Sequence, residues 1–200
     1  MSASSKKIAR PVLLTAFRPW GDKNSNMSEM VLRDLESELI AHGAESRILD
    51  VLYNKVDEFI ENLDISAYSA IISLGIMRQD QPPIRLESRA CKKHFKPDDT
   101  GISPSFNESV QREYKGSSSL INLPFEHFPD RYDMAVSAEA GAYLCEYLYF
   151  RLLEKTHNTD TKCVFIHISN ENLKEKKDFV LDYLRALQAE DLAAPTPSGQ

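Results

Sequence analysis

The stretch Ala70-Ile-Ile-Ser-Leu-Gly75 is almost continuously apolar and ends in glycine. Pro11–Phe17 and Lys162–Ile168 are also short runs rich in Val, Leu, Ile and Phe. Runs of this kind are typical of strands that are buried on both faces, as they are in parallel sheets. The three stretches therefore predict an α/β protein with a mostly parallel central sheet covered by helices on both faces.

The segments between these runs alternate between helical and extended patterns. Apolar spacing predicts helices over residues 28–43, 56–63, 139–153 and 171–187, and further strands over 46–53, 84–90 and 119–123. Ser28 is the expected N-cap of the first helix, and Gly43 is expected to end it. The polar segment 91–118 is predicted to be a long loop, a feature that is often functional in compact domains. Residues 1–190 are expected to form one domain, and 191–200 a disordered tail.

The composition excludes several classes of protein. The chain has 200 residues and a formal net charge of −6, with acidic and basic residues interspersed. Nucleic-acid binding requires a clustered basic face, which is not seen in this sequence. No apolar run is long enough to span a bilayer, and the first residues lack the apolar core of a secretory signal. The expectation is a cytoplasmic protein that binds neither nucleic acid nor membrane.

Three cysteines, Cys91, Cys145 and Cys163, form an odd set that argues against a disulfide framework and for reduced thiols. Cys91-x-x-His94 has the spacing of zinc ligands, but no second pair completes a four-ligand structural site. A structural zinc site is therefore the less favoured use of these thiols. Gly75 is followed by no further glycine up to Pro83, so neither a P-loop nor a dinucleotide-binding motif is present.

Cys145 follows the small-residue segment Ser137-Ala-Glu-Ala-Gly-Ala and is expected within the first turns of a helix. The helix dipole and the free N–H groups at that position favour a thiolate. The same N–H groups are suited to an oxyanion hole. The alternative is that Cys145 is a small core residue, because free cysteine is among the most buried residue types.

Two further residues complete a candidate site. His167 lies near the carboxyl end of a buried strand, where open α/β sheets place their reactive groups. Glu87 lies on the predicted strand 84–90, and it is either the partner of a histidine or a solvated residue paired with Arg85 or Arg89. His167 in turn has the alternative of a satisfied core residue. Together with Cys145 they supply the nucleophile, base and orienting carboxylate that covalent acyl transfer requires.

Phe17 and Trp20 flank the turn after the first strand, where they either clamp a flat ligand or anchor the loop. The surrounding segment, Thr15-Ala-Phe-Arg-Pro-Trp-Gly21 followed by Asn26-Met-Ser28, resembles the T-G-F-x-P-F-G…N-P-S opening of the pyroglutamyl peptidase I family of cysteine peptidases, family C15. Four later segments are similar to that family's remaining motifs in order and spacing: Leu74-Gly75 with 84–90, Pro97–Gly101, Val136–Cys145 and Phe165–Ile168.

The resemblance implies a three-layer α/β/α sandwich of the phosphorylase/hydrolase-like kind and removal of an N-terminal pyroglutamyl residue from peptides. It assigns nucleophile, base and orienter to Cys145, His167 and Glu87. It also implies a homo-oligomer, dimer or tetramer, and no cofactor. The substrate pocket is expected to include Phe17, Trp20, Ile76 and Tyr143. Ile76 stands where the family has a glutamine that recognises the lactam, so this departure from the family's motif concerns the specificity for the substrate. The alternatives are a thiol hydrolase of another small N-acyl or cyclic amide and a non-catalytic descendant of the fold.

Overall fold

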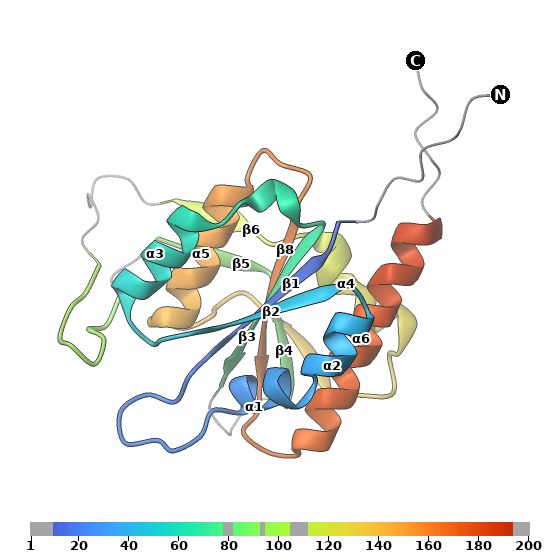
Figure 1. Ribbon diagram of the computed structural model, residues 1–200, viewed down its shortest axis with the longest axis horizontal. Coiled ribbons are helices and arrows are strands. Elements are labelled where there is room, and N and C mark those ends of the chain that lie inside the picture. The colour runs from blue at the N-terminus through green and yellow to red at the C-terminus, as the bar shows by residue number, and fades with distance from the viewer. Residues whose placement is uncertain (1–9, 78–81, 93–94, 105–111, 194–200) are drawn as a thin grey trace.

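A mixed β-sheet with helices on both faces forms the centre of the molecule (Figure 1). The computed structural model describes residues 10–77, 82–92, 95–104 and 112–193. The strands are β1 (Val12–Phe17), β2 (Ala44–Leu49), β3 (Ala70–Ile76), β4 (Ile84–Glu87), β5 (Arg89–Cys91), β6 (Glu113–Lys115), β7 (Met134–Ser137) and β8 (Lys162–Ile168). Within the described residues, the main sheet has six strands in the order β2-β1-β3-β8-β4-β7, and β5 pairs with β6 in a separate small sheet.

Nearly every neighbouring pair in the main sheet is parallel. The exception is the pairing of β4 with β8, which is antiparallel, and β7 then runs parallel to β4. The central strands are buried on both faces. In β8, for example, Phe165 packs into one apolar cluster while Val164 and Ile166 pack into the other. Burial on both sides explains why these strands are almost continuously apolar.

The helices form the two outer layers (Figure 1). One face is covered by α1 (Met27–Asp34), α2 (Glu36–Ala41), α4 (Ser118–His127) and α6 (Leu173–Ala193), and the other by α3 (Tyr53–Asn62) and α5 (Leu144–Thr156). A 3₁₀ turn, Ile65–Ala67, precedes β3. This arrangement confirms the predicted α/β/α sandwich with a mostly parallel sheet. Within the described parts of the chain, no helix combines the length and apolar character needed to cross a membrane.

The first predicted helix begins and ends differently from the expectation. The N-cap is Asn26, whose side-chain oxygen accepts the Ser28 N–H at 2.9 Å, so Ser28 lies inside the helix. The helix is also interrupted at Leu35, which separates α1 from α2. The prediction of Ser28 as the N-cap was wrong because serine and asparagine are both common N-caps, so the sequence alone did not distinguish Ser28 from Asn26. Tertiary contacts select Asn26, and one of them is the Asn26 amide donating to Arg18 O at 3.1 Å.

Several other boundaries were predicted incorrectly. The segment 84–90 is two strands in different sheets, because the chain leaves the main sheet at Ser88. Residues 119–123 belong to the helix α4 rather than to a strand, and the helix expected from Glu139 begins at Leu144, after the unpredicted strand β7. The segment 91–118 contains β6. The expected tail, 191–200, lies mostly outside the described residues and stays a prediction.

The parallel strands bring three predicted site segments to one edge of the sheet. β1 ends at Phe17, β3 at Ile76 and β8 at Ile168. Gly75 and His167 are direct neighbours in the register of β3 and β8. Because the carboxyl ends of parallel strands lie at the same edge, the residues that follow them surround a common space.

Candidate active site

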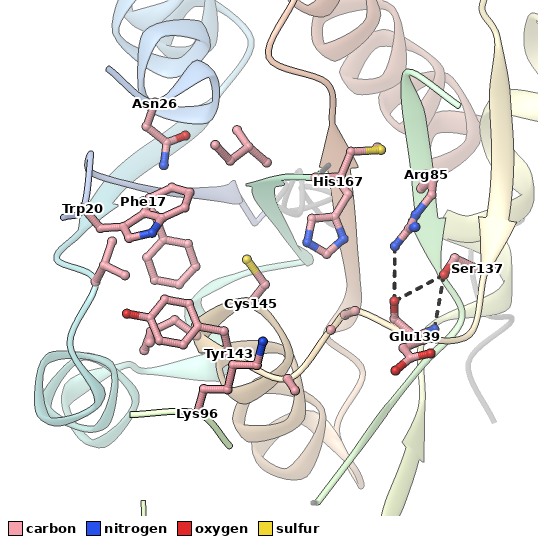
Figure 2. Close-up of a pocket in the computed structure, with 17 residues that line it drawn as sticks. Phe17, Trp20, Asn26, Arg85, Lys96, Ser137, Glu139, Tyr143, Cys145 and His167 are labelled. Atoms are coloured by element: carbon pink, nitrogen blue, oxygen red, sulfur yellow. Dashed lines mark hydrogen bonds between the residues drawn. The ribbon is translucent and has the colours of Figure 1, made fainter. Parts of the chain in front are cut away.

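A cavity of about 660 Å³ opens at this edge of the sheet (Figure 2). Its size is within the range of pockets that bind small molecules. The lining residues are Phe17, Trp20, Asn26, Val51, Ile76, Met77, Arg85, Lys96, Ser137, Glu139, Ala140, Gly141, Ala142, Tyr143, Leu144, Cys145 and His167. Six of the seven residues predicted for the site therefore line one cavity, and the seventh, Glu87, lies directly behind it against His167.

Cys145 is the second residue of α5 and is half-buried. The first N–H groups of a helix lack intrahelical acceptors and carry the positive end of the helix dipole, which favours a thiolate. Burial acts in the opposite direction, and together with the negative charge of Glu87 it raises the pKa of the Cys145 thiol to about 12. The resting thiol is therefore protonated at neutral pH and needs a nearby base to become a nucleophile.

His167 is buried near the end of β8, and its Nδ1 lies 2.8 Å from Oε1 of Glu87. A carboxylate acceptor at Nδ1 favours the tautomer that carries its proton there, which leaves Nε2 as the basic ring nitrogen. Figure 2 shows the imidazole and the Cys145 sulfur turned toward the same part of the cavity. The arrangement can accept a proton from the thiol and hold the resulting imidazolium against a carboxylate.

Glu87 is fully buried on β4. Burial by itself raises the pKa of a carboxyl group, but the hydrogen bond and charge of His167, with smaller contributions from Ser137 and then Arg85, lower the pKa of Glu87 below its ordinary value. The carboxylate is therefore ionised at neutral pH. The alternative that Glu87 is a solvated surface residue is wrong.

Gly75 is a site residue that sequence reasoning missed. A Cβ placed on Gly75 would lie 2.8 Å from Cys145 Sγ and equally close to two atoms of the Phe165 ring. Real Cβ atoms do not approach other atoms so closely, so only glycine allows the sulfur to sit against β3. A glycine that ends a buried strand was visible in the sequence, but the neighbour that requires it was not.

The aromatic residues line the mouth of the cavity. Phe17, Trp20 and Tyr143 lie on the side opposite Arg85 (Figure 2). The turn that carries Trp20 is fixed by the Gly21 N–H, which donates to Asp99 Oδ2 at 2.8 Å, and by Lys23 Nζ, 4.1 Å from the centre of the Trp20 ring. These contacts hold the turn and leave Trp20 as a wall of the cavity.

Arg85, Ser137 and Glu139 line the cavity but were not predicted as site residues. Arg85 Nη2 donates to Glu87 Oε1 at 2.8 Å and to the Glu139 carbonyl at 3.1 Å. The sequence held one signal for Arg85: residues two apart on a strand share a face, so an orienting Glu87 implies that Arg85 faces the same side.

No metal centre is visible in the described part of the chain, where no three histidine, cysteine, aspartate or glutamate side chains are grouped to hold an ion. Cys91 Sγ lies 3.6 Å from Glu113 Oε2, and Cys163 is buried in the core. His94, the other half of the zinc-like pair, lies outside the described residues.

The fold and the cavity together define an α/β protein in which a thiol, an imidazole and a buried carboxylate lie together at the carboxyl edge of the sheet. These are the three groups that thiol-based acyl transfer uses. No protein-family model matches the chain. The pyrrolidone-carboxylate peptidase of a Thermoanaerobacter species is 25% identical over 170 residues, covering 78% of this chain and 81% of the relative. The enzyme of the same name from Thermococcus onnurineus is 25% identical over 164 residues, covering 78% and 82%.

Among solved structures, pyroglutamyl peptidase I from Bacillus amyloliquefaciens superposes with a TM-score of 0.76 at 20% identity, covering 90% of this chain and 97% of that structure. This likeness concerns the fold. With the sequence relatives it confirms the resemblance seen in the motifs: the chain is a divergent relative of the pyrrolidone-carboxylate peptidases.

Proposed function

We propose that this protein is a cysteine peptidase that hydrolyses the amide bond after an N-terminal pyroglutamyl residue. The observation that carries the proposal is the His167–Glu87 pair, 2.8 Å apart, which opens on the same cavity as Cys145. The relatives named pyrrolidone-carboxylate peptidases support the choice of reaction. The proposed substrates are peptides with a blocked, pyroglutamyl N-terminus.

The proposed reaction begins when His167 Nε2 takes the thiol proton and Cys145 Sγ attacks the pyroglutamyl carbonyl. The oxyanion of the tetrahedral intermediate is stabilised by backbone N–H groups at the start of α5, where Tyr143 provides no side-chain cap. The imidazolium, held by Glu87, then protonates the leaving amine as the C–N bond breaks. Water, deprotonated by His167, hydrolyses the thioester and releases pyroglutamate and the free thiol.

Phe17, Trp20 and Tyr143 are proposed to hold the acyl group between aromatic faces. A lactam also presents an N–H and a carbonyl, and a site that hydrogen-bonds these groups discriminates strongly against analogues that lack them. Ile76 contributes no such partner from its side chain, and its neighbour Met77 adds a second apolar side chain to the wall. These two residues favour the second candidate, a thiol hydrolase of another small N-acyl or cyclic amide.

The first experiment is turnover of a pyroglutamyl-arylamide by the purified, reduced protein, with Cys145→Ala as the control. Release of the arylamine by the wild type and its loss in the variant, with the circular dichroism spectrum unchanged, is the expected result. No turnover at high enzyme concentration contradicts pyroglutamyl specificity. Labelling of Cys145 by a thiol-reactive probe, suppressed in His167→Ala, would then support the second candidate, whereas an unreactive Cys145 would indicate a non-catalytic descendant.

The proposal includes a cytoplasmic location and a homo-oligomeric state. Three free thiols, Cys91, Cys145 and Cys163, suit a reducing compartment. Cell fractionation tests the location, and light scattering on the purified protein distinguishes a dimer or tetramer from a monomer.

A further inference from the structure

Arg85 lies between the proposed catalytic pair and the wall of the cavity. It is the direct neighbour of His167 in the register of β4 and β8, and its side chain is 16% exposed. Its Nη2 is 2.8 Å from Glu87 Oε1, the same oxygen that lies 2.8 Å from His167 Nδ1. One carboxylate oxygen therefore accepts from a guanidinium and from an imidazole at once.

Because both donors reach the same oxygen over 2.8 Å, Arg85 Nη2 lies at most about 5.6 Å from His167 Nδ1, which places a permanent positive charge beside the imidazole. A guanidinium stays protonated at all working pH values. The guanidinium lowers the pKa of Glu87 in the same direction as the larger effect of His167. Arg85 and His167 therefore hold one oxygen of the same carboxylate.

The same guanidinium also holds the segment that leads into the nucleophile. Figure 2 shows the hydrogen bond from Arg85 to the Glu139 carbonyl, which is 3.1 Å long. Glu139 belongs to the stretch 139–142 that lines the cavity just before α5. Arg89 ties the residue just before this stretch, because its Nε donates to the Ala138 carbonyl at 3.1 Å and its Nη1 to Glu113 at 2.9 Å.

We propose that Arg85 is a positioning residue for this chemistry: it holds the carboxylate oxygen of Glu87 that His167 uses, and it fixes the wall beside Cys145. The inference rests on the proposed thiol chemistry but not on the identity of the acyl group. Among the described residues, the other charged or titratable side chains that line the cavity with His167 are Cys145, Tyr143, Glu139 and Lys96, and the charge of Glu146 acts on Cys145. On β3 the register neighbour of His167 is Gly75, which carries no charge.

The test is the pH dependence of alkylation of Cys145 by iodoacetamide, followed on the Cys145 peptide by mass spectrometry. A neutral reagent is chosen so that Arg85 does not attract it. Loss of a nearby cation raises the pKa of an acid by about one unit. In Arg85→Gln the midpoint of the reaction should therefore move upward by about one pH unit. Arg85→Lys, which keeps the charge, should stay within about 0.3 units of the wild type.

Arg89→Gln is the matched control, because it weakens the same stretch of chain without touching Glu87. Its midpoint should not move. An unchanged midpoint in Arg85→Gln, an equal shift in Arg89→Gln, or a wild-type Cys145 that does not react at any pH overturns the proposal. If Arg85→Gln does not fold, Arg85→Ser, which leaves space for water, takes its place. Because alkylation needs no substrate, a failure of pyroglutamyl turnover remains a separate result.

Discussion

Replacement of Gly75 by alanine tests how closely the proposed nucleophile is packed against the sheet. The new Cβ would lie 2.8 Å from Cys145 Sγ and 2.8 Å from two ring atoms of Phe165. Favourable contacts between such atoms are about 3.5–4.0 Å, so the sulfur or the ring must move by about 0.7–1.2 Å. Phe165 is fully buried in the sheet, which leaves the shorter Cys145 side chain as the part that gives way.

Two effects follow from this displacement. Overpacking of this kind costs about 1–3 kcal/mol of stability, which lowers Tm by about 2–12 °C in a domain of this size. A nucleophile misplaced by about 1 Å loses about 100-fold in rate. We therefore expect Gly75→Ala to fold, to melt earlier and to show kcat on a pyroglutamyl-arylamide lowered by about two orders of magnitude, measured beside differential scanning calorimetry.

Ile71→Val is the matched control. Ile71 lies on the same strand and faces the same apolar cluster as Phe165, but it does not line the cavity. Removing one buried methylene costs about 0.5–1.5 kcal/mol and should leave kcat unchanged. A Gly75→Ala protein with wild-type kcat and Tm would refute the close packing of Cys145 against Gly75. An equal loss of kcat in Ile71→Val would show that stability alone, and not the sulfur position, sets the rate.

Three further predictions concern the same cavity. Cys145→Ala should abolish turnover of any substrate while leaving Tm within about 2 °C, since it removes a single heavy atom from a residue that is half-buried as a whole; retained turnover would exclude this nucleophile. Ile76→Gln should raise kcat/KM for a pyroglutamyl substrate relative to an N-acetyl substrate by about tenfold or more, because it adds a polar partner to the wall; an unchanged ratio would show that Ile76 does not contact the acyl group. The folded-state pKa of Glu87 lies below its unfolded value, so its contribution to stability is present at neutral pH and is lost as pH falls from about 4.3 downward through the folded pKa. Urea unfolding between pH 3 and 7 should show a smaller acid-dependent loss in Glu87→Gln than in the wild type, and equal slopes would contradict the lowered pKa.

The central sheet could be predicted because its information is local. The runs 70–75 and 162–168 are apolar at nearly every position, and burial on both faces requires that pattern. The rule that functional groups lie at the carboxyl ends of parallel strands then singled out Phe17 and His167. Both residues line the cavity.

The errors occurred where the deciding contacts are distant in sequence. Residues 119–123 contain Leu120, Ile121 and Leu123, a spacing that suits a strand or one turn of a helix. Packing decides for the helix: Tyr183 Oη of α6 donates to the Leu120 carbonyl at 2.6 Å. The break at Ser88 has a similar origin, since its N–H donates to the Ser137 carbonyl while its own carbonyl accepts from Gly116, just after β6.

The position of Glu87 shows most clearly why the site needed the structure. β4 runs antiparallel to β8, so the chain moves deeper under the sheet edge as it passes from Arg85, opposite His167, to Glu87, opposite Phe165. The carboxylate thus reaches His167 Nδ1 from the buried side, and Nε2 is left to the cavity. A parallel β4 would have brought its last residue to the open edge, where water competes for the carboxylate. Among the described strands of the main sheet, the single antiparallel pairing therefore lets a fully buried glutamate orient a histidine at the cavity. No local pattern in residues 84–87 reveals the direction of β4.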